Sequence, residues 1–440
     1  MSPPHPHSHD EPRPAPAWAR RLALLLLIPA ALLTAVGMLL LWPHDTPDPT
    51  AETDGQRRVF GTVAGVAPQP CPPAPEDEQQ EPLPGAPAPV CGTVTVTLTS
   101  GAQAGTQVST DIPSGPGALQ VGTGDDVVLL LLDEDGGGQG YSIVDFQRST
   151  QLWLLGAAFA LAVIAFGRWR GLTALLGLAV TFAVLLLFIV PAILDGRSPI
   201  LVAIVGAAAI MLAVLYLTHG LHITTSVAVL GTLASLTLTA GLSGVVTASV
   251  HLSGVADETS NYLTITQGDV NMRGLLLAGI VIGSLGVLDD VTVTQSATVT
   301  ELARANPGYG FRHLYAAATR VGRAHIASVI NTIVLAYAGA SLPLMLLFSA
   351  GTTPAGELLT GELIAQELVR SAVGTIGLIT AVPITTALAA VAAVHHRRTA
   401  DERHDNLAEA AAEPAQPATR PPVEDPWAAF VERHPGWRNE

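Results

Sequence analysis

The sequence contains no lysine, and all 21 of its basic residues are arginine. A Gly-x-x-x-x-Gly-Lys phosphate loop is therefore absent, and neither a His-Glu-x-x-His nor a Gly-x-Ser-x-Gly motif occurs. The sequence therefore lacks the motifs typical of an ATP-driven pump, a zinc metalloprotease and a serine hydrolase. We expect no enzymatic activity and no cofactor.

Charged residues are also scarce. They make up 13% of the 440 residues, against 49% hydrophobic residues, and the mean hydropathy is positive. Several apolar runs reach the roughly 20 residues needed to cross about 30 Å of hydrocarbon. The sequence therefore predicts a multi-spanning α-helical membrane protein with about eight transmembrane helices. Their expected ranges are 22–42, 152–166, 172–194, 200–217, 223–250, 274–293, 326–348 and 372–394.

The arginines indicate the orientation of these helices. With the N-terminus in the cytoplasm, most of the arginines that flank a span fall on the cytoplasmic side, as the positive-inside rule requires. Both termini are therefore predicted to be cytoplasmic. The inner set is Arg168, Arg170, Arg304, Arg312, Arg320, Arg323, Arg397 and Arg398, and the outer set is Arg197, Arg273 and Arg370.

Both ends of the chain have the composition of solvated tails. Residues 1–21 are rich in Pro and His, and residues 396–440 are rich in Ala, Pro and Glu, so both are predicted to be disordered. The run at 22–42 is longer than the apolar core of most signal peptides and lacks a clear cleavage pattern. We interpret it as a retained transmembrane anchor.

Between the first two spans, residues 43–150 change to short β-branched runs separated by Gly, Pro and Asp. They predict a small extracytoplasmic β domain inserted after the first helix, followed by a seven-helix bundle at 151–395. The domain is a barrel or a sandwich, and an OB-type barrel is one form that the strand count alone does not select. The expected strands are 59–66, 92–99, 107–112, 126–132 and 141–144, with a Pro-rich loop at 69–90.

Only two cysteines occur, Cys71 and Cys91, and they bracket the Pro-rich loop. Outside the cytoplasm a disulfide between them is permitted, and two free thiols are the alternative. The same segment, from Pro43 to Thr150, holds fifteen acidic residues and three arginines, a net charge of −12. An acidic domain of this kind excludes nucleic acid as the expected partner.

Two adjacent acids lie in the predicted span 274–293, in the stretch GSLGVLDDVTVTQ. At 100° per residue, three glycines of this span share one face with Asp290, whereas Asp289 lies about 100° away. Because small residues let a neighbouring helix come close, we expect this glycine stripe to pack against another span and to carry Asp290 into the bundle. The stripe consists of Gly279, Gly283, Gly286, Asp290, Thr294 and Ala297.

An acid inside hydrocarbon is costly, and such residues usually face a protein interior or a water-filled cavity. We therefore interpret the pair as a site for ion binding or proton exchange. The alternative is that the pair, near the cytoplasmic end of its span, marks the water interface; both interpretations stay open. The coupling candidates are Asp289, Asp290, Thr292, Thr294 and Gln295.

The secondary polar candidates are His219, His222, His325 and Asn331. A proton relay between a histidine and the acids is one interpretation, and a structural role at the interface is the other. The spacing of these candidate residues in the sequence does not identify a bound metal.

Four stretches resemble the YibE/F family of bacterial membrane proteins. They lie at residues 141–148 (YSIVDFQR), 283–295 (with the core LDDVTVTQ), 325–344 and 374–386, and the resemblance extends over about residues 59–393. It implies a multi-spanning protein of the bacterial cytoplasmic membrane with an extracytoplasmic N-terminal region. It implies no particular reaction.

Two functions remain open at this point. The first is transport of an ion or small solute, coupled at the Asp-Asp motif. The second is a non-catalytic scaffold or sensor whose outer β domain binds an envelope protein. The expected partners are the lipid bilayer together with the ion or solute, or the envelope protein; the oligomeric state is not determined.

Overall fold

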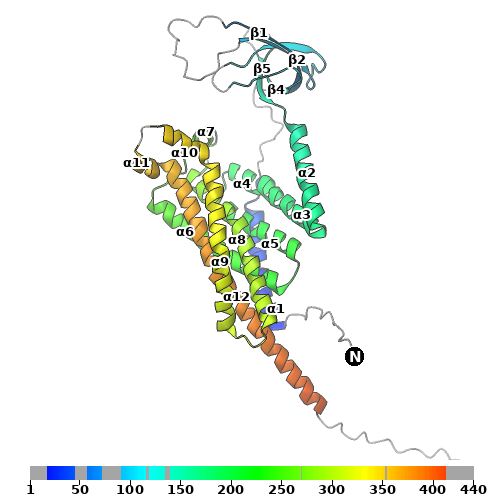
Figure 1. The fold of residues 1–440 in the computed structure, drawn as a ribbon, viewed down its shortest axis with the longest axis vertical. Helices are drawn as coiled ribbons and strands as arrows, with labels where there is room; N and C mark the ends of the chain where they lie inside the picture. The colour runs from blue at the N-terminus through cyan, green and yellow to red at the C-terminus, as the bar shows by residue number, and fades with distance from the viewer. Residues whose placement is uncertain are drawn as a thin grey trace, which may run out of the picture. The chain divides into compact units, whose positions relative to one another are not determined.

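The computed structural model describes residues 17–44, 57–71, 91–114, 118–133, 139–268, 270–351 and 354–412. The chain divides into two compact units (Figure 1). The first comprises Met1–Gly37 with Pro199–Glu440, and the second comprises Met38–Ser198. The predicted features at 1–16, 72–90 and 413–440 lie outside the described residues.

The second unit contains an antiparallel sheet in the order β3-β2-β1-β4-β5. The five expected strands are confirmed. They are β1 (Arg57–Gln69), β2 (Cys91–Leu98), β3 (Gln107–Asp111), β4 (Asp126–Asp133) and β5 (Gln139–Phe146).

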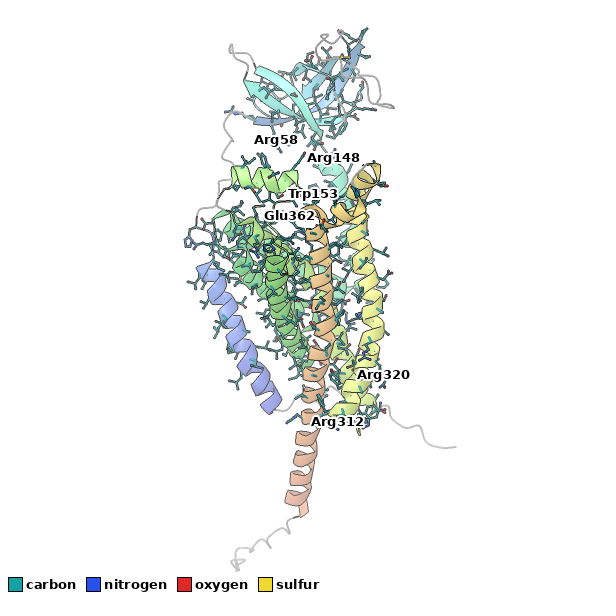
Figure 2. All side chains as sticks on the ribbon, turned by 90° about the vertical axis from the view of Figure 1, so that its left-hand side faces the viewer. Arg58, Arg148, Trp153, Arg312, Arg320 and Glu362 are labelled. Carbon is teal, nitrogen blue, oxygen red and sulfur yellow. A yellow bond between two sulfur atoms is a disulfide. The ribbon has the colours of Figure 1, made fainter. Side chains whose placement is uncertain are left out.

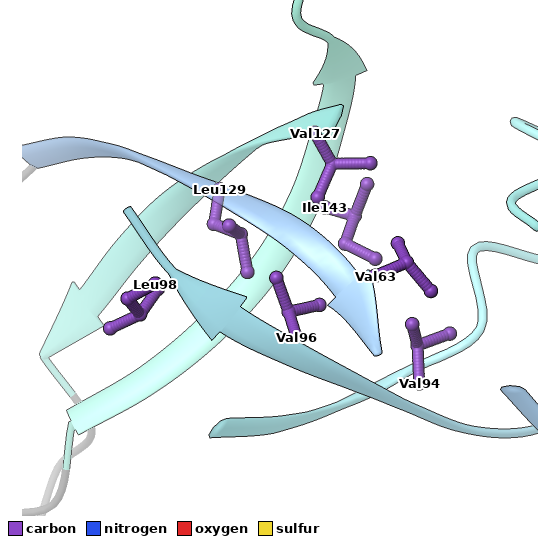
Figure 3. Close-up of a cluster of buried hydrophobic side chains, with 7 residues drawn as sticks. All are labelled: Val63, Val94, Val96, Leu98, Val127, Leu129 and Ile143. Carbon is purple, nitrogen blue, oxygen red and sulfur yellow. The ribbon is translucent and has the colours of Figure 1, made fainter. Parts of the chain in front are cut away.

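The sheet has one buried face, which follows from the two-residue period of a strand. In β2 the side chains of Val94, Val96 and Leu98 are buried, whereas the threonines between them are more exposed. Together with residues from the neighbouring strands they form a continuous apolar core (Figure 3). Its members are Val63, Val94, Val96, Leu98, Val127, Leu129 and Ile143.

The two edge strands of this sheet approach each other. The Thr110 hydroxyl on β3 donates a hydrogen bond to the backbone oxygen of Tyr141 on β5, so the sheet curls toward closure. A groove of about 630 Å³ lies where the two edges meet, and Thr110, Ile112, Leu119 and Tyr141 contribute to its lining.

A disulfide joins Cys71 to Cys91, as the sequence permitted. Cys91 opens β2 opposite Gln69 at the end of β1, so the bond closes the connection between two paired strands.

Removing this bond is expected to weaken the β domain. The loop that it closes spans a sequence separation of 20, for which chain entropy predicts a loss of about 3 kcal/mol in the free energy of unfolding. Pulse proteolysis of the full chain across a urea series would measure the loss in a Cys71→Ser, Cys91→Ser double variant. Adding reductant should destabilise the parent protein and leave the double variant unchanged; equal sensitivity of both would contradict the prediction.

A short polar motif connects the sheet to the next helix. The Asp145 carboxylate accepts hydrogen bonds from the Phe146 N–H and from the Arg148 guanidinium, both at 2.8 Å. These contacts, the backbone bond first, hold the pKa of Asp145 below its usual value. The Arg148 guanidinium also lies over the Phe146 ring. The motif therefore fixes the chain where β5 ends and a helix begins.

The helices of the second unit follow directly. They are α2 (Ser149–Gly167), α3 (Trp169–Val184), a π-helical turn η2 (Leu185–Ile189) and α4 (Val190–Leu194). Pro191 has no N–H for a regular helical bond, which explains the irregular turn just before it.

The first unit is a helical bundle. Its central members α6, α8 and α12 pack against one another, and α5 and α9 pack against α8. The helices are α1 (Ala17–Leu40), α5 (Pro199–His219), α6 (Ile223–Ser249), α7 (Glu258–Thr266), α8 (Met272–Ala305), α9 (Phe311–Ala340), α10 (Leu342–Ala350), α11 (Ala355–Thr360) and α12 (Glu362–Ala412).

Glycines let α6 and α12 pack at short range. A Cβ atom added at Gly231 on α6 would overlap the Thr385 side chain of α12. One at Gly377 on α12 would overlap the Thr239 side chain of α6. In each contact a glycine of one helix therefore packs against a threonine of the other. Small residues at such contacts are typical of closely packed membrane helices.

A carboxylate holds one end of this bundle together. Glu362, the first residue of α12, accepts hydrogen bonds from the Ser253 N–H at 2.7 Å, the Ser253 hydroxyl at 2.5 Å and the Gly254 N–H at 3.1 Å. Figure 2 shows Glu362 at this end, and Arg312 and Arg320 on α9 near the other end. The connection after α6 is therefore tied to the start of α12.

Within the described residues, seven helical segments are long and apolar enough to cross a membrane: Ser149–Gly167, Trp169–Leu194, Pro199–His219, Ile223–Ser249, Met272–Ala305, Phe311–Ala340 and Glu362–His395. They correspond to the seven spans expected after the β domain. Helix α1 contributes a further apolar segment, Leu25–Leu40 among the residues whose side chains the structure describes, and this segment is not one of the seven.

Three helices extend beyond the ranges expected from the sequence. The span expected at 274–293 is part of a longer helix, because the apolar pattern continues beyond the two acids. The span expected at 326–348 belongs to a helix that begins at Phe311 and is interrupted at Ser341, two residues before Pro343. The tail expected to be disordered from 396 continues α12 as far as Ala412. The segment 362–370 is the beginning of α12.

Candidate functional site

The two adjacent acids lie near the middle of α8, which runs from Met272 to Ala305. The sequence predicted them near the end of a span, because the polar residues that follow resemble an interface. In the structure these residues instead continue the helix, and several of them are buried. The position weakens the interpretation that the acids simply mark the water interface.

The glycine stripe of α8 faces away from the bundle. Gly279, Gly283, Gly286, Asp290 and Thr294 are all exposed. An added Cβ atom at Gly279 or Gly286 would meet no other atom within 4 Å, and at Gly283 it would meet only the Tyr337 hydroxyl, at 3.6 Å. Within the described part of the first unit no helix packs closely on this stripe, contrary to the expectation that it packs against another span and carries Asp290 inward. The close glycine packing lies between α6 and α12 instead.

Asp289 has the inward position that was expected for Asp290. Its neighbours on the helix face, Leu285, Thr292 and Ser296, are buried. The Asp289 side chain itself is half-buried, and its Oδ1 atom is covered. Among the residues of the described chain, Oδ1 has no hydrogen-bond partner. A carboxylate oxygen without a partner in a membrane bundle is costly, which marks Asp289 as the functional candidate of the pair.

The interior beside Asp289 is lined with hydroxyl groups. Thr292, one turn further along α8, shares a hydrogen bond of 2.6 Å with Thr232 of α6, and both side chains are fully buried. Ser296 on the same face donates to the backbone oxygen of Thr224 at 2.8 Å. The faces of α6 and α8 that meet are therefore polar as well as closely packed.

Gln295 connects three helices. Its Nε2 donates to the Ala318 backbone oxygen of α9 at 2.9 Å and to the Thr386 hydroxyl of α12 at 2.7 Å. Its Oε1 lies where a Cβ atom at Gly322 of α9 would be, at 2.7 Å. Gln295 is 3% exposed, so it acts as a buried crosslink rather than as a group open to solutes.

The histidines are not joined to the acids. His219 contacts the Thr218 hydroxyl through Nδ1 at 2.8 Å, and His222 is the residue just before α6. The Nε2 atom of His325 is buried, and no partner for it occurs in the described part of the chain. Among the described residues no hydrogen bond or ion pair links a histidine to Asp289 or Asp290, and Asn331 is exposed on α9.

Several site residues were missed in the sequence because each is an ordinary serine or threonine. The helical spacing of hydroxyl residues on α6 is the signal that could have found them, since they recur every three or four residues from Thr232. All are fully buried in the structure: Thr232, Ser235, Thr239, Ser243 and Thr247.

A cluster of three or more metal-binding side chains does not occur among the residues that the structure describes. The oxygen donors on the inward side of α8 include the Asp289 carboxylate and the Thr292 and Ser296 hydroxyls. Such oxygens suit hard cations or protons rather than transition metals.

These observations define the class of the protein: a chain with seven helices long and apolar enough to cross a membrane, preceded by an antiparallel β sheet. The chain belongs to the YibE/F-like protein family, whose family model matches residues 155–395. The match covers the helices from within α2 to the apolar part of α12, and it leaves the β sheet and the YSIVDFQR stretch outside. No curated protein and no solved structure matches the chain significantly.

Proposed function

We propose that this protein transports an ion or small solute across a membrane and that Asp289 is the residue that couples the movement. One observation carries the proposal: the Asp289 Oδ1 atom is covered and has no hydrogen-bond partner in the described chain, beside a hydroxyl-lined interior. A carboxylate in this setting is stabilised when it binds a cation or proton and is destabilised when it is charged and has neither. Coupled transport requires that the residue alternate between these two states.

The orientation that accompanies this proposal follows from charge. We propose a bacterial cytoplasmic membrane with both termini inside and the β sheet outside. The disulfide supports an oxidising compartment for the sheet. The strand order, with β1 between β2 and β4 and with β3 near β5, agrees with an OB-type barrel.

Exchange of Asp289 for asparagine is the direct test of transport. Proteoliposomes containing the Asp289→Asn variant are expected to lose cation- or proton-driven flux, measured with internal ion-sensitive dyes, because asparagine cannot change charge. The matched control is Asp290→Asn, which alters the adjacent acid on the exposed face and should retain most of the flux. Flux that survives in Asp289→Asn, or that is lost equally in both variants, would contradict the proposed role.

A scaffold or sensor is the second candidate, and the groove between β3 and β5 favours it. The groove has a volume of about 630 Å³ and runs along two strand edges, which can accept an extended peptide. In-cell crosslinking with and without residues 58–147 separates the two functions. A scaffold should lose its envelope partners in the shortened chain, whereas a transporter should show no crosslinked partner that depends on this segment.

A further inference from the structure

The face of α8 that carries Asp289 is polar in one direction along the helix. Thr292, Ser296 and Thr300 follow Asp289 after three, seven and eleven residues, a spacing that keeps them on one side of the helix. Thr292 and Ser296 are fully buried, and Thr300 is half-buried. A row of hydroxyl groups therefore runs from Asp289 toward the end of α8.

Every member of this hydroxyl row contacts α6. The Thr292 hydroxyl lies 2.6 Å from the Thr232 hydroxyl. Ser296 donates to the Thr224 backbone oxygen at 2.8 Å, and the Thr300 hydroxyl lies 3.5 Å from the Thr224 hydroxyl. The row is therefore enclosed between α6 and α8, and its contacts move toward the beginning of α6 as α8 continues.

Polar contacts continue at the end of the bundle where α5 ends and α6 begins. The Tyr216 hydroxyl of α5 lies 3.2 Å from the Ser226 hydroxyl of α6. The Thr225 hydroxyl of α6 donates to the His219 backbone oxygen at 3.5 Å, and His219 is an exposed residue at the end of α5. Polar groups of α5, α6 and α8 thus extend from Asp289 to this exposed end, which we call the His219 end.

In the other direction the same face of α8 is apolar. Leu285, Ile282 and Ala278 precede Asp289 by four, seven and eleven residues. Leu285 and Ala278 are buried. Helix α5 packs against both α6 and α8, and its residues 200–215 carry no polar side chain. Toward the start of α8, Asp289 therefore has only apolar neighbours on its own face.

Helix α6 does contain two buried hydroxyl residues in that direction, Ser243 and Thr247. The Ser243 hydroxyl donates to the Ala240 backbone oxygen of its own helix. The Thr247 hydroxyl has no hydrogen-bond partner in the described chain. Neither residue forms a hydrogen bond to α8, so the row that begins at Asp289 leads to the His219 end alone.

The donors beside Asp289 suit a proton better than a metal ion. Metal cations such as Ca²⁺ and Mg²⁺ take about six oxygen ligands. The Thr292 and Ser296 hydroxyls are already engaged with α6, and a group of three or more His, Cys, Asp or Glu does not occur among the described residues. A proton needs only the carboxylate. Hydroxyl groups both donate and accept hydrogen bonds, so they can pass a proton on.

Few ionisable groups accompany Asp289 on this side of α8. Helix α6 has none, and α5 has Tyr216 and His219, both at the His219 end. Asp290 lies on the exposed face of α8. The other ionisable side chains of α8 and of the helices packed against it are Arg273, Glu301 and Arg304 on α8, Arg312, His313, Tyr315, Arg320, Arg323, His325 and Tyr337 on α9, and Glu362, Glu367, Arg370 and those from His395 onward on α12.

We propose that the ion exchanged at Asp289 is a proton, and that in this conformation it enters and leaves through the hydroxyl row from the His219 end only; this inference deepens the proposed function and rests on it. In the proposed orientation this end is cytoplasmic. Water at the His219 end supplies the proton, and each hydroxyl of the row gives up one proton as it accepts another. The proton neutralises the carboxylate whose Oδ1 is covered and has no partner in the described chain.

Labelling with a hydrophobic carbodiimide tests the route without measuring transport. The reagent modifies a protonated carboxyl in an apolar setting, so labelling follows the protonated fraction of Asp289. The full-length Asp290→Asn variant is used in sealed vesicles of one orientation, with the pH on each side set by impermeant buffers. Tandem mass spectrometry locates the label within the tryptic peptide 274–304.

A cysteine marker identifies the compartment that the His219 end faces. Leu221 lies between α5 and α6 and is 86% exposed, so an impermeant maleimide should react with Leu221→Cys from that side. The two native cysteines are joined in the disulfide and do not react.

Acidification on the His219 side is expected to raise labelling of Asp289 by up to about tenfold per pH unit, the limit for one carboxyl. Acidification on the opposite side alone is expected to leave labelling unchanged. An equal response to both sides, a response to the opposite side only, or no response to pH would overturn the one-sided route. Labelling that Na⁺ or K⁺ suppresses at constant pH would overturn the assignment of a proton.

Thr292→Val removes the first hydroxyl of the row. It is expected to lower proton flux in proteoliposomes by about tenfold, the worth of one hydrogen bond. Thr292→Ser keeps the hydroxyl and should retain the flux, as should Thr294→Val on the exposed face of the same helix. Size-exclusion profiles verify that each variant is folded. Parent-like flux in Thr292→Val, or equal losses in Thr292→Val and Thr292→Ser, would contradict a role for the hydroxyl.

The two proposals fail separately. If Asp289→Asn abolishes flux while labelling ignores the pH on the His219 side, transport stands and the proton route is wrong. If labelling follows the pH on the His219 side while Asp289→Asn leaves flux unchanged, the proton route stands and the coupling role is wrong.

Discussion

Replacement of Gly377 by valine is expected to destabilise the helical bundle by about 3 kcal/mol, the upper range for an overpacked core. The backbone of α12 approaches α6 at this position, and an added Cβ atom would overlap the Thr239 hydroxyl. Thr239 is fully buried and its hydroxyl donates to the Ser235 backbone oxygen at 2.8 Å, so it cannot turn away freely. The helices would have to separate. The unfolding midpoint in an SDS titration of purified protein measures the effect.

Gly374→Val is the matched control for this experiment. Gly374 lies one turn earlier on α12, and a Cβ atom there would meet nothing within 4 Å in the described chain. A double-mutant cycle adds a second check: Gly377→Ala should destabilise the parent protein and be tolerated in a Thr239→Ala background, where the opposing hydroxyl is gone. Equal losses for Gly374→Val and Gly377→Val would show that helix propensity, not the contact between α6 and α12, determines the result.

Replacement of Gln295 by leucine is expected to cost about 2 kcal/mol and to loosen α9 in particular. The change removes two buried hydrogen bonds, each worth about 1 kcal/mol. Helix α9 depends on them because its few buried residues, Leu314, Ala318, Gly322 and Ile326, all lie in its first half. Hydrogen exchange of α9 peptides, together with the SDS unfolding midpoint, would report both effects.

Thr294→Val is the control for the glutamine variant. Thr294 is the preceding residue of α8, but it lies on the exposed face. Its replacement should leave both the midpoint and the exchange of α9 near the parent values. Faster exchange spread evenly over α6, α9 and α12 in the Gln295→Leu variant would contradict a local role for the crosslink.

The helices and strands could be predicted from the sequence because their signals are local. Alternation of Thr and Val over residues 92–99 predicts one buried face, and the structure buries Val94, Val96 and Leu98. Apolar runs predicted the seven membrane-length helices for the same reason. Length was less predictable. Beyond its two acids α8 carries Thr292, Gln295 and Ser296, whose hydrogen bonds to neighbouring helices cannot be read from the sequence.

The candidate site was predicted in part. The helical period correctly separated Asp289 from Asp290, since that angle depends only on residue spacing. It did not determine which face is covered. The sequence pattern of a glycine stripe is the same whether or not another helix packs against it. Here the stripe on α8 is exposed, and the close contacts are at Gly231 and Gly377.

The sequence by itself determined the membrane character of the chain, the strands of its β domain and the presence of two acids on different sides of one helix. These depend on composition and on the periods of a helix and a strand. Only the tertiary structure decided that Asp289 is the inward acid and that Thr232 and Thr292 meet beside it. That decision depends on how α6, α8 and α12 pack, because burial of a side chain is a property of its neighbours and not of its own position in the chain.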